Sequence, residues 1–409
     1  MILGLLCKSA ALLLLMLAFL DSSAAWKVNR VFIFGIGYTG RFLIDEILQK
    51  YPHCHISGTC RSVEKADQLQ KLGIEAFPFD IDNDVLLSRL GLQSLKNANA
   101  VLSTIPTTNA RINAEKDATK ETCVSECSST HHIKDYEDSV LSLYRSLIEE
   151  SIARDTCTYV AYMSTTGVYG DHQGEWVDET SDCRLSPTSK AYPRFRAEQQ
   201  WLNISGQAKK YVFRLAGIYG PHRSALHTYV QQRIAHDGDD DDVSRRNRGK
   251  MAPYGDTNND KGSKDNDGDQ EELNGDDYRR TVNRVHVMDI VTAITSSLFE
   301  QNDSATDTAT IYNLVDNEPA AREKVMQYCK ELCEGIELQE LCLRLSIQMQ
   351  GIKKPRKDRE GSIRARRRQQ EHKKVDNAKA KAQLWRKREG LIFPSYREGL
   401  LALLERGSS

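Results

Sequence analysis

Short apolar runs alternate along the chain with segments whose apolar residues recur at helical spacing. The first run, Arg30–Phe34, is β-branched and aromatic and stops at Gly35, as a buried parallel strand does. Phe42, Leu43 and Ile47 then mark one face of a helix. Further strands are expected at 55–59, 75–80, 100–105 and 159–163, with helices between them. This alternation predicts an α/β fold with a doubly wound parallel sheet.

Three polar segments interrupt the alternation and suggest where domains end. Residues 107–132 form a polar insertion, 237–277 are dominated by Asp, Asn, Gly and Lys, and 353–388 carry basic clusters. We predict disorder for the second and a solvated helix or tail for the third, because neither holds enough apolar residues to offset the entropy of ordering. Both are expected to be dispensable for the fold. We therefore predict a main domain at 30–236 and a remainder of the fold at 278–408, which includes a small discontinuous C-terminal lobe.

Composition narrows the class of protein. The 409 residues are 40% hydrophobic and 28% charged, which excludes collagen-like and wholly disordered chains. The net charge of -1 at pH 7 conceals an acidic block and a basic block. A nucleic-acid-binding role for residues 353–388 would require strongly salt-dependent affinity, and a solvated segment is the simpler hypothesis. We therefore expect no specific nucleic-acid partner.

The first 25 residues have the layout of a secretory signal peptide. Lys8 precedes an apolar run that ends at Leu20, and small residues up to Ala25 follow. The run is short for a bilayer span, so we expect cleavage near Ala25, no stable membrane span and entry into the lumen of the endoplasmic reticulum. Trp26 leaves an alternative open, because an aromatic residue at this point is also typical of bipartite presequences that target the plastids of algae.

The ten cysteines do not define a disulfide framework, because they are scattered over a long chain. Two pairs have i,i+4 spacing, Cys123/Cys127 and Cys329/Cys333. Such a pair could chelate a metal from a helix, but neither has a nearby His or a second pair. We predict ordinary thiols or a local disulfide, and no metal site.

Gly35, Gly37 and Gly40 form a GxGxxG motif, with Tyr38 and Thr39 between the last two, placed after a predicted strand and before a predicted helix. The first glycine permits a tight turn, the second lets the backbone approach a pyrophosphate, and the third allows close packing of helix on strand. The helix N-terminus then faces the anion. The motif predicts a dinucleotide-binding Rossmann domain at 30–236.

The end of the second strand distinguishes NAD from NADP. A carboxylate there accepts from a ribose hydroxyl, whereas a cation pairs with the 2′-phosphate of NADP. Here Arg61 follows Cys60, and no acid lies between Ile56 and Val63. Because a guanidinium can hold a phosphate with two hydrogen bonds, we predict NADP in preference to NAD.

Longer segments resemble a known family. Residues 163–170 read Met-Ser-Thr-Thr-Gly-Val-Tyr-Gly, and 186–196 run from Ser-Pro-Thr to Tyr192-Pro-Arg-Phe-Arg196. In these two segments the chain resembles the extended or atypical short-chain dehydrogenase/reductase superfamily, which includes the nucleoside-diphosphate-sugar epimerases and dehydratases. Later landmarks of that family follow in order, at 214–221, 283–290, 312–319 and 393–400. The similarity covers most of the chain apart from the signal and the insertions.

The resemblance implies a set of catalytic residues. In the superfamily a Tyr four residues before a Lys acts as general acid/base, and a Ser or Thr after the fifth strand holds the substrate oxygen. Thr165, or its neighbour Ser164 or Thr166, takes the hydroxyl position, and Tyr192 takes the tyrosine position. Arg196 stands where Lys is expected, which puts proton transfer in doubt because Arg differs from Lys in shape, donor geometry and hydration.

Other residues receive roles from the same resemblance. Tyr169 is a rival phenol, although the family uses that position for packing. Asp80 resembles the acid that meets the adenine ring, and Thr104 belongs to the strand-end segment that lines the cofactor. His286 and Asp289 fall in a motif that stabilises the substrate lobe, so structural roles are expected for them.

Two functions follow from different classes of protein. The first is an NAD(P)-dependent oxidoreductase or epimerase acting on a small molecule, a nucleotide sugar or a related carbonyl or alcohol. The sequence leaves its oligomeric state open, with a homodimer as one alternative. The alternative is a catalytically lapsed NADP-binding scaffold or redox-responsive assembly factor, which would keep the glycine turn and tolerate Arg196. Substrate-dependent turnover of the cofactor distinguishes the two.

Overall fold

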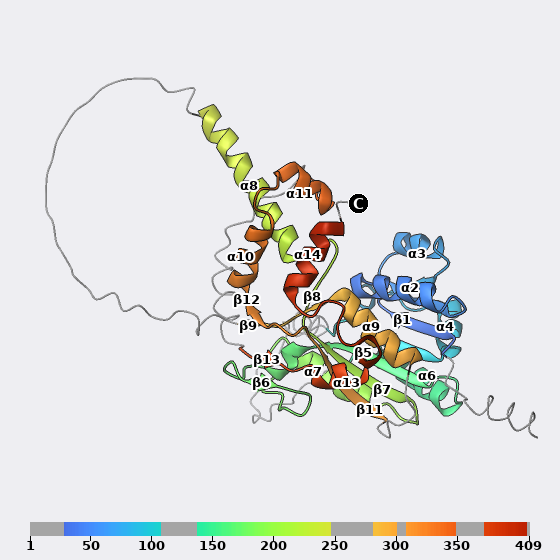
Figure 1. Ribbon diagram of the computed structural model, residues 1–409. Coiled ribbons are helices and arrows are strands. Elements are labelled where there is room, and N and C mark those ends of the chain that lie inside the picture. Colours follow the sequence, from blue (N-terminus) through green and yellow to red (C-terminus); the bar gives the residue numbers. More distant parts are fainter. Residues whose placement is uncertain (1–27, 108–136, 247–280, 301–307, 349–371, 407–409) are drawn as a thin grey trace, which may run out of the picture. The chain divides into compact units, whose positions relative to one another are not determined.

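The computed structural model describes residues 28–107, 137–246, 281–300, 308–348 and 372–406, which Figure 1 shows as ribbons. Several predicted features lie outside these residues: the signal peptide, the Cys123/Cys127 pair, and the parts of the acidic and basic segments at 247–277 and 353–371. The chain forms two compact units, each assembled from three segments. The first comprises residues up to 164, 193–213 and 291–311, and the second comprises 165–192, 214–290 and 312–409.

A seven-stranded sheet underlies the first unit, with the order β11-β7-β5-β4-β1-β2-β3. Its strands are β1 (Arg30–Phe34), β2 (His55–Cys60), β3 (Glu75–Pro78), β4 (Ala100–Ser103), β5 (Tyr159–Thr165), β7 (Lys209–Leu215) and β11 (Ala309–Leu314). Strand β1 lies between β2 and β4, and Val31 pairs in parallel with Ile56 on one side and Ala100 on the other. The five strands expected from the apolar runs are confirmed, together with the doubly wound α/β class.

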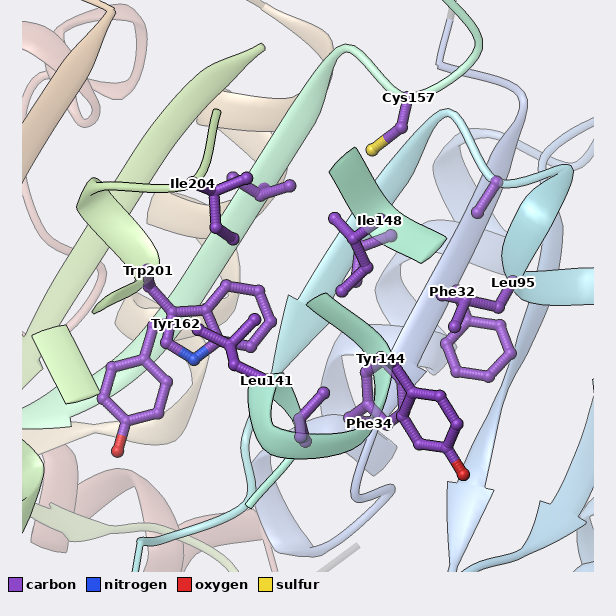
Figure 2. Packing of buried hydrophobic residues seen from close by; sticks show 14 of the residues in the cluster. Phe32, Phe34, Leu95, Leu141, Tyr144, Ile148, Cys157, Tyr162, Trp201 and Ile204 are labelled. Atoms are coloured by element: carbon purple, nitrogen blue, oxygen red, sulfur yellow. The ribbon is translucent and has the colours of Figure 1, made fainter. Parts of the chain in front are cut away.

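Helices cover both faces of this sheet. They are α2 (Tyr38–Lys50), α3 (Val63–Gln70), α4 (Arg89–Lys96), α6 (Leu141–Ala153), α7 (Tyr192–Leu202) and α9 (Val287–Phe299). On one face, Phe32 and Phe34 pack with α6 and α7 in a single buried cluster, in which Tyr162 stacks on Trp201 at a centroid distance of 6.0 Å (Figure 2). On the other face, Tyr51 at the end of α2 stacks on Phe299 of α9 at 3.8 Å. Because successive strand residues alternate between faces, apolar runs such as Arg30–Phe34 fill both layers.

The second unit contains short ladders and helices. Its elements are η2 (Thr166–Tyr169), β6 (Trp176–Val177), β8 (Gly217–Tyr219), α8 (Ala225–Arg246), β9 (Thr281–Val282), β10 (Arg284–His286), β12 (Ala320–Ala321), α10 (Arg322–Leu332), α11 (Leu338–Arg344), β13 (Lys374–Val375), α13 (Ala378–Gln383), η4 (Arg386–Arg388) and α14 (Tyr396–Arg406). Strands β8 and β10 pair in parallel, as do β6 and β13, whereas β9 and β12 are antiparallel. Residues 165–192 and 214–236, which sequence assigned to the Rossmann domain, belong to this unit, because their ladder partners come from later segments.

Helix α8 continues further than the composition suggested. It extends to Arg246, so residues 237–246 are helical although we expected disorder from 237 onward. The first half of the helix is anchored by Leu226 and Val230, which are fully buried. Once these turns are fixed, each added residue gains one backbone hydrogen bond, so the helix propagates past the apolar positions.

The end of the basic segment is packed, whereas the composition predicted a solvated helix or tail that the fold could spare. Residues 372–388 pack into the second unit, where Val375 and Trp385 are buried and the Asn377 side chain donates to Val315 O at 2.7 Å. Buried Lys373 donates through Nζ to Gly170 O at 2.7 Å. Polar residues, including Lys379 and Lys381, separate the anchors Val375 and Trp385, and Arg386 follows them, so an averaged composition concealed them.

Asp289 and His286 are structural, as predicted. The Asp289 carboxylate accepts from Ile392 N at 2.6 Å and Phe393 N at 3.3 Å, and its burial raises the pKa to about 7. The His286 ring is buried beside Tyr219, at a centroid distance of 5.2 Å. The two bonds of Asp289, together with the His286 ring at 4.0 Å from that of Phe393, tie the segment after α13 to the start of α9.

The second cysteine pair predicted from the sequence, Cys329/Cys333, lies within the described residues. Cys329 and Cys333 are free, buried thiols whose pKa values are raised by desolvation. In the part of the chain that the structure describes, no three Cys, His, Asp or Glu side chains are grouped to hold a metal ion. Of the helices described here, none combines the length and the hydropathy needed to cross a membrane.

Candidate functional site

The glycine turn after β1 requires glycine at its first position. Gly35 has a φ of +84°, and a Cβ there would lie 2.8 Å from Ile105 Cγ1 and 3.0 Å from Thr104 Oγ1. The turn is fixed on both sides, since Gly35 N donates to Thr59 Oγ1 at 2.8 Å and Thr104 Oγ1 donates to Gly35 O. The backbone is therefore held in one conformation by the neighbouring strands β2 and β4.

Gly37 leaves the N-terminus of α2 open. It is the N-cap of the helix, no side chain caps the first turn, and that turn contains no acidic residue. A Cβ on Gly37 would meet only Gly35 O, at 3.8 Å, and the residue is exposed. Uncapped N–H groups at a helix N-terminus carry partial positive charge and bind anions. Gly37 thus allows a ligand to approach this backbone without being needed for internal packing.

The other residues of the motif lie behind the turn. A Cβ on Gly40 would make ordinary contacts of 3.6 to 4.0 Å with Gly35, Ile36 and Ile33, consistent with a helix packed closely on its strand. Tyr38 and Thr39 begin α2 and are half-buried. The Tyr38 ring packs edge to face on Phe42, at a centroid distance of 5.2 Å.

A cavity of about 430 Å³ opens at the carboxyl ends of β1 to β4. Residues 35–37, 59–62, 79–82 and 104–106 line it, with Lys65 and Ser139. It brings together five predicted cofactor residues: Gly35, Gly37, Arg61, Asp80 and Thr104. Tyr38, Thr39 and Gly40 do not line it. Ligands of open α/β sheets bind outside the carboxyl ends of the strands, so this cavity is the candidate site of the first unit.

Two cations flank the cavity at the end of β2. Arg61 is exposed at the strand end, and Lys65 lies in the first turn of α3, where Lys65 N donates to the capping Ser62 Oγ at 3.3 Å. Sequence reasoning missed Lys65, although a Ser followed three residues later by Lys after a strand could have indicated a cation at a helix start. A cation pair at this position favours a ligand with an additional negative group.

Asp80 lines the same cavity from the end of β3. Its carboxylate caps η1 (Ile81–Asn83): Oδ1 accepts from Asp82 N at 3.1 Å and Oδ2 from Asn83 Nδ2 at 2.9 Å. The loop itself therefore orients this acid at the cavity wall.

Gly58 was also missed by sequence reasoning. It lies inside β2, and a Cβ there would come within 2.3 Å of Ile33 O. Any larger residue would push β2 away from β1, the strand that carries the glycine turn. A lone glycine inside a strand signals such close backbone approach.

The predicted hydroxyl residue caps a turn in the second unit. Thr165 ends β5, and its Oγ1 accepts from Gly167 N at 3.1 Å. Its neighbour Ser164 instead donates its hydroxyl proton to buried Glu198, so this hydroxyl already has an acceptor. A Cβ on Gly167 would lie 3.8 Å from Ala191 Cβ, so the residue before Tyr192 packs beside the Thr165 turn.

Tyr192 and Arg196 share one helix. Tyr192 is the first residue of α7 and Arg196 follows one turn later, and both are half-buried. The rival phenol is engaged elsewhere: buried Tyr169 donates to Asn313 Oδ1 at 2.8 Å, beneath Arg214 at 4.7 Å from its ring centre. Burial raises the pKa of Tyr169 to about 12. Tyr169 is therefore a packing residue, as the family pattern implied.

No family model and no curated protein matches the sequence. Among solved structures, a functionally unknown conserved protein from Silicibacter pomeroyi is similar, with a TM-score of 0.56 and 23% identity over 92% of this chain and 98% of its own. UDP-glucose 4-epimerase from Thermotoga maritima, solved with UDP-glucose, gives a TM-score of 0.52 at 14% identity, covering 92% and 98% of the two chains. A putative NAD-dependent epimerase/dehydratase from Methylobacillus flagellatus gives 0.50 at 17%, covering 94% and 100%.

At these identities the likeness establishes the fold. The chain has the α/β architecture of NAD-dependent epimerase/dehydratase structures, along nearly its whole length. The predicted resemblance is therefore confirmed at the level of the fold.

Proposed function

We propose that this protein binds a nicotinamide dinucleotide in the cavity at the end of β1 to β4, preferring NADP to NAD. The observation that carries the proposal is the uncapped start of α2 at Gly37, which opens onto a cavity flanked by Arg61 and Lys65. The helix start suits a pyrophosphate, and the two cations suit a 2′-phosphate. Asp80 and Thr104 complete the wall where an adenosine would lie in the family.

We further propose that the protein is an oxidoreductase or epimerase acting on a nucleotide sugar or a related carbonyl or alcohol. The bound nicotinamide would supply hydride transfer. Tyr192 would exchange a proton with the substrate oxygen, and Arg196 would support the phenolate by its charge. Thr165 suits the role of orienting that oxygen, because Gly167 N uses one acceptor site of its hydroxyl and leaves the O–H able to donate.

A catalytically lapsed NADP-binding protein is the second candidate, favoured by one observation. Arg196 replaces the compact ammonium of Lys with a planar guanidinium on the helix that carries Tyr192. A scaffold or redox-responsive assembly factor would tolerate this change and keep the glycine turn. Substrate-dependent change in cofactor absorbance supports the enzyme, and dinucleotide binding without turnover supports the scaffold.

Gly37→Val is expected to weaken dinucleotide binding at least tenfold, because the isopropyl group would occupy the space that a pyrophosphate needs. The fold should remain, since the φ of -95° suits an L residue and a Cβ meets nothing nearer than 3.8 Å. Calorimetric titration with NADP, beside urea unfolding, measures both effects. Gly40→Ala is the matched control and should bind normally. Unchanged affinity in a folded Gly37→Val protein would contradict the proposed site.

Arg61→Ala is expected to lower NADP affinity by about tenfold or more and to leave NAD affinity nearly unchanged. A charge-assisted hydrogen bond contributes about 1.5 to 3 kcal/mol, and only NADP carries the 2′-phosphate that forms it. Lys65→Ala should give a smaller loss, since an ammonium acts as a point charge. Dissociation constants for both cofactors provide the test, and equal affinities in the wild type would overturn the preference.

A further inference from the structure

A second cavity, of about 500 Å³, lies entirely within the second unit. Its volume is in the range of small-molecule sites, about 300 to 1,000 Å³. The residues that line it include three arginines, Arg223, Arg284 and Arg322, and no acidic residue. This one-sided charge indicates an anionic ligand.

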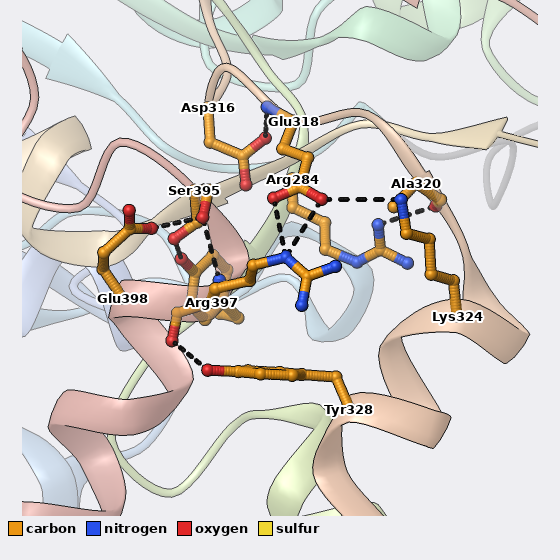
Figure 3. A network of polar contacts seen from close by, with 10 residues as sticks. Arg284, Asp316, Glu318, Ala320, Lys324, Tyr328, Ser395, Arg397 and Glu398 are labelled. Carbon is orange, nitrogen blue, oxygen red and sulfur yellow. Dashed lines mark hydrogen bonds and ion pairs between the residues drawn. The ribbon is translucent and has the colours of Figure 1, made fainter. Parts of the chain in front are cut away.

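Arg284 is held rigidly at this cavity (Figure 3). Its Nη1 donates to Val282 O and to Ala320 O, both at 2.8 Å, so the guanidinium has a fixed position on β10. The buried neighbour Asp316 has a pKa raised to about 8 by desolvation, and the charge of Arg284 acts against that rise.

Glu318, another acid of this network, is already paired. Glu318 accepts from Arg397 Nε with both carboxylate oxygens at 3.2 Å and lies 3.7 Å from Lys324 Nζ (Figure 3). Glu318 is therefore engaged by Arg397 and Lys324 at the edge of this network.

Two helices begin at the cavity and add to its positive field. Ser224 and Ala225, at the start of α8, line it together with Arg223, and the first turn of α8 contains no acidic residue. Arg322 is the first residue of α10, whose N-cap Ala321 offers no side-chain cap and whose first turn contains one acid, Glu323. Helix N-termini and exposed arginines together suit a doubly charged anion such as a phosphate monoester.

Away from the arginines the cavity is mostly apolar. Ile218, Val282, Val325, Met326 and Leu400 form much of this part of the wall. Three of its side-chain hydroxyls are engaged locally: Thr228 Oγ1 donates to Ser224 O at 3.3 Å, Ser224 Oγ bonds His227 Nδ1 at 2.8 Å, and the Tyr219 hydroxyl donates to Ser395 O at 3.2 Å. The fourth, the buried hydroxyl of Tyr396, has no hydrogen-bond partner among the described residues.

These walls disfavour a nucleotide sugar. A base, a ribose and a hexose would be desolvated against apolar side chains with few replacement hydrogen bonds, which costs free energy for each polar group. An alkyl or aryl group would bury favourably there.

We propose that this cavity binds a phosphate monoester with an apolar body, held at its charged end by Arg223, Arg284 and Arg322. The inference stands apart from the proposed function, because the cavity is built from second-unit residues alone and needs no dinucleotide. A Gly37→Val protein should therefore bind such a ligand as the wild type does.

Calorimetric titration of the full chain with octyl phosphate tests the proposal, with inorganic phosphate, octanoate and UDP-glucose as comparison probes. Octyl phosphate should bind at least tenfold more tightly than each of the other three. Arg322→Gln, at an exposed position, should weaken that binding at least tenfold. The matched control is Arg344→Gln on α11, whose arginine pairs with Glu340 and does not line the cavity. This control should bind as the wild type does.

Met326→Gln tests recognition of the apolar body apart from recognition of the phosphate, because it changes the half-buried apolar wall and leaves the arginines unchanged. It should weaken octyl phosphate and leave inorganic phosphate unchanged. Three results would overturn the proposal: tighter binding of UDP-glucose than of octyl phosphate, equal binding of octanoate, or unchanged octyl phosphate affinity in a folded Arg322→Gln protein.

Discussion

With an identified carbonyl or alcohol substrate, Tyr192→Phe is expected to lower turnover by a factor of about 10² to 10⁴, the usual contribution of a general acid/base. The phenyl ring keeps the shape of the side chain at the start of α7 and loses only the exchangeable proton. Dinucleotide affinity should therefore stay close to that of the wild type. Steady-state kinetics and calorimetric titration of the same preparation separate the two quantities.

Arg196→Lys sharpens this test. Lysine restores the family residue one turn after Tyr192, so turnover should be retained or rise if the site is a working variant. Tyr169→Phe is the control, since Tyr169 is buried and bonded to Asn313; it should affect stability and leave turnover intact. A fall in turnover with Tyr169→Phe and none with Tyr192→Phe would show that Tyr169, and not Tyr192, transfers the proton. Absence of any turnover, with cofactor binding intact in every variant, would favour the scaffold.

Trp385→Ala is expected to lower the free energy of unfolding by about 3 to 5 kcal/mol, the usual cost of deleting a large buried aromatic side chain. The indole is fully buried, and its Nε1 donates to Asp289 O at 3.1 Å, a hydrogen bond that the change would remove. Urea unfolding of the full chain measures the effect.

Trp176→Ala offers a matched comparison for this result. The Trp176 side chain lies on β6 and is 57% exposed, so its removal should change stability by roughly 0.5 kcal/mol or less. If both tryptophan variants were equally stable, residues 372–388 would be dispensable after all, as their composition had suggested.

The sheet could be predicted because buried parallel strands appear as continuous apolar runs. Arg30–Phe34 and 159–163 satisfy this rule, and the carboxyl ends of such strands necessarily meet at one edge. Five candidate cofactor residues therefore met in one cavity. The close approach at Gly58 was not predicted, because it depends on the separation between β1 and β2.

The remainder depends on contacts between residues far apart in the sequence. The pairing of Ser164 with Glu198 crosses 34 positions, and no local pattern distinguishes Ser164 from Thr165 as the available hydroxyl. The same applies to Trp385, whose neighbours Arg386 and Lys387 made the segment look solvated. Composition averages over a window, whereas burial is decided by single anchors and their distant partners.

The bond from Lys373 Nζ to Gly170 O joins residues 203 positions apart, and β13 pairs with β6 at the same place. Proteins are synthesised from the N-terminus, so residues 165–192 must leave the ribosome long before their partner strand exists. Closing so long a loop is entropically costly and slow. We therefore expect the second unit to be completed late in folding, and until then the edge of β6 stays open to wrong pairing and to chaperones.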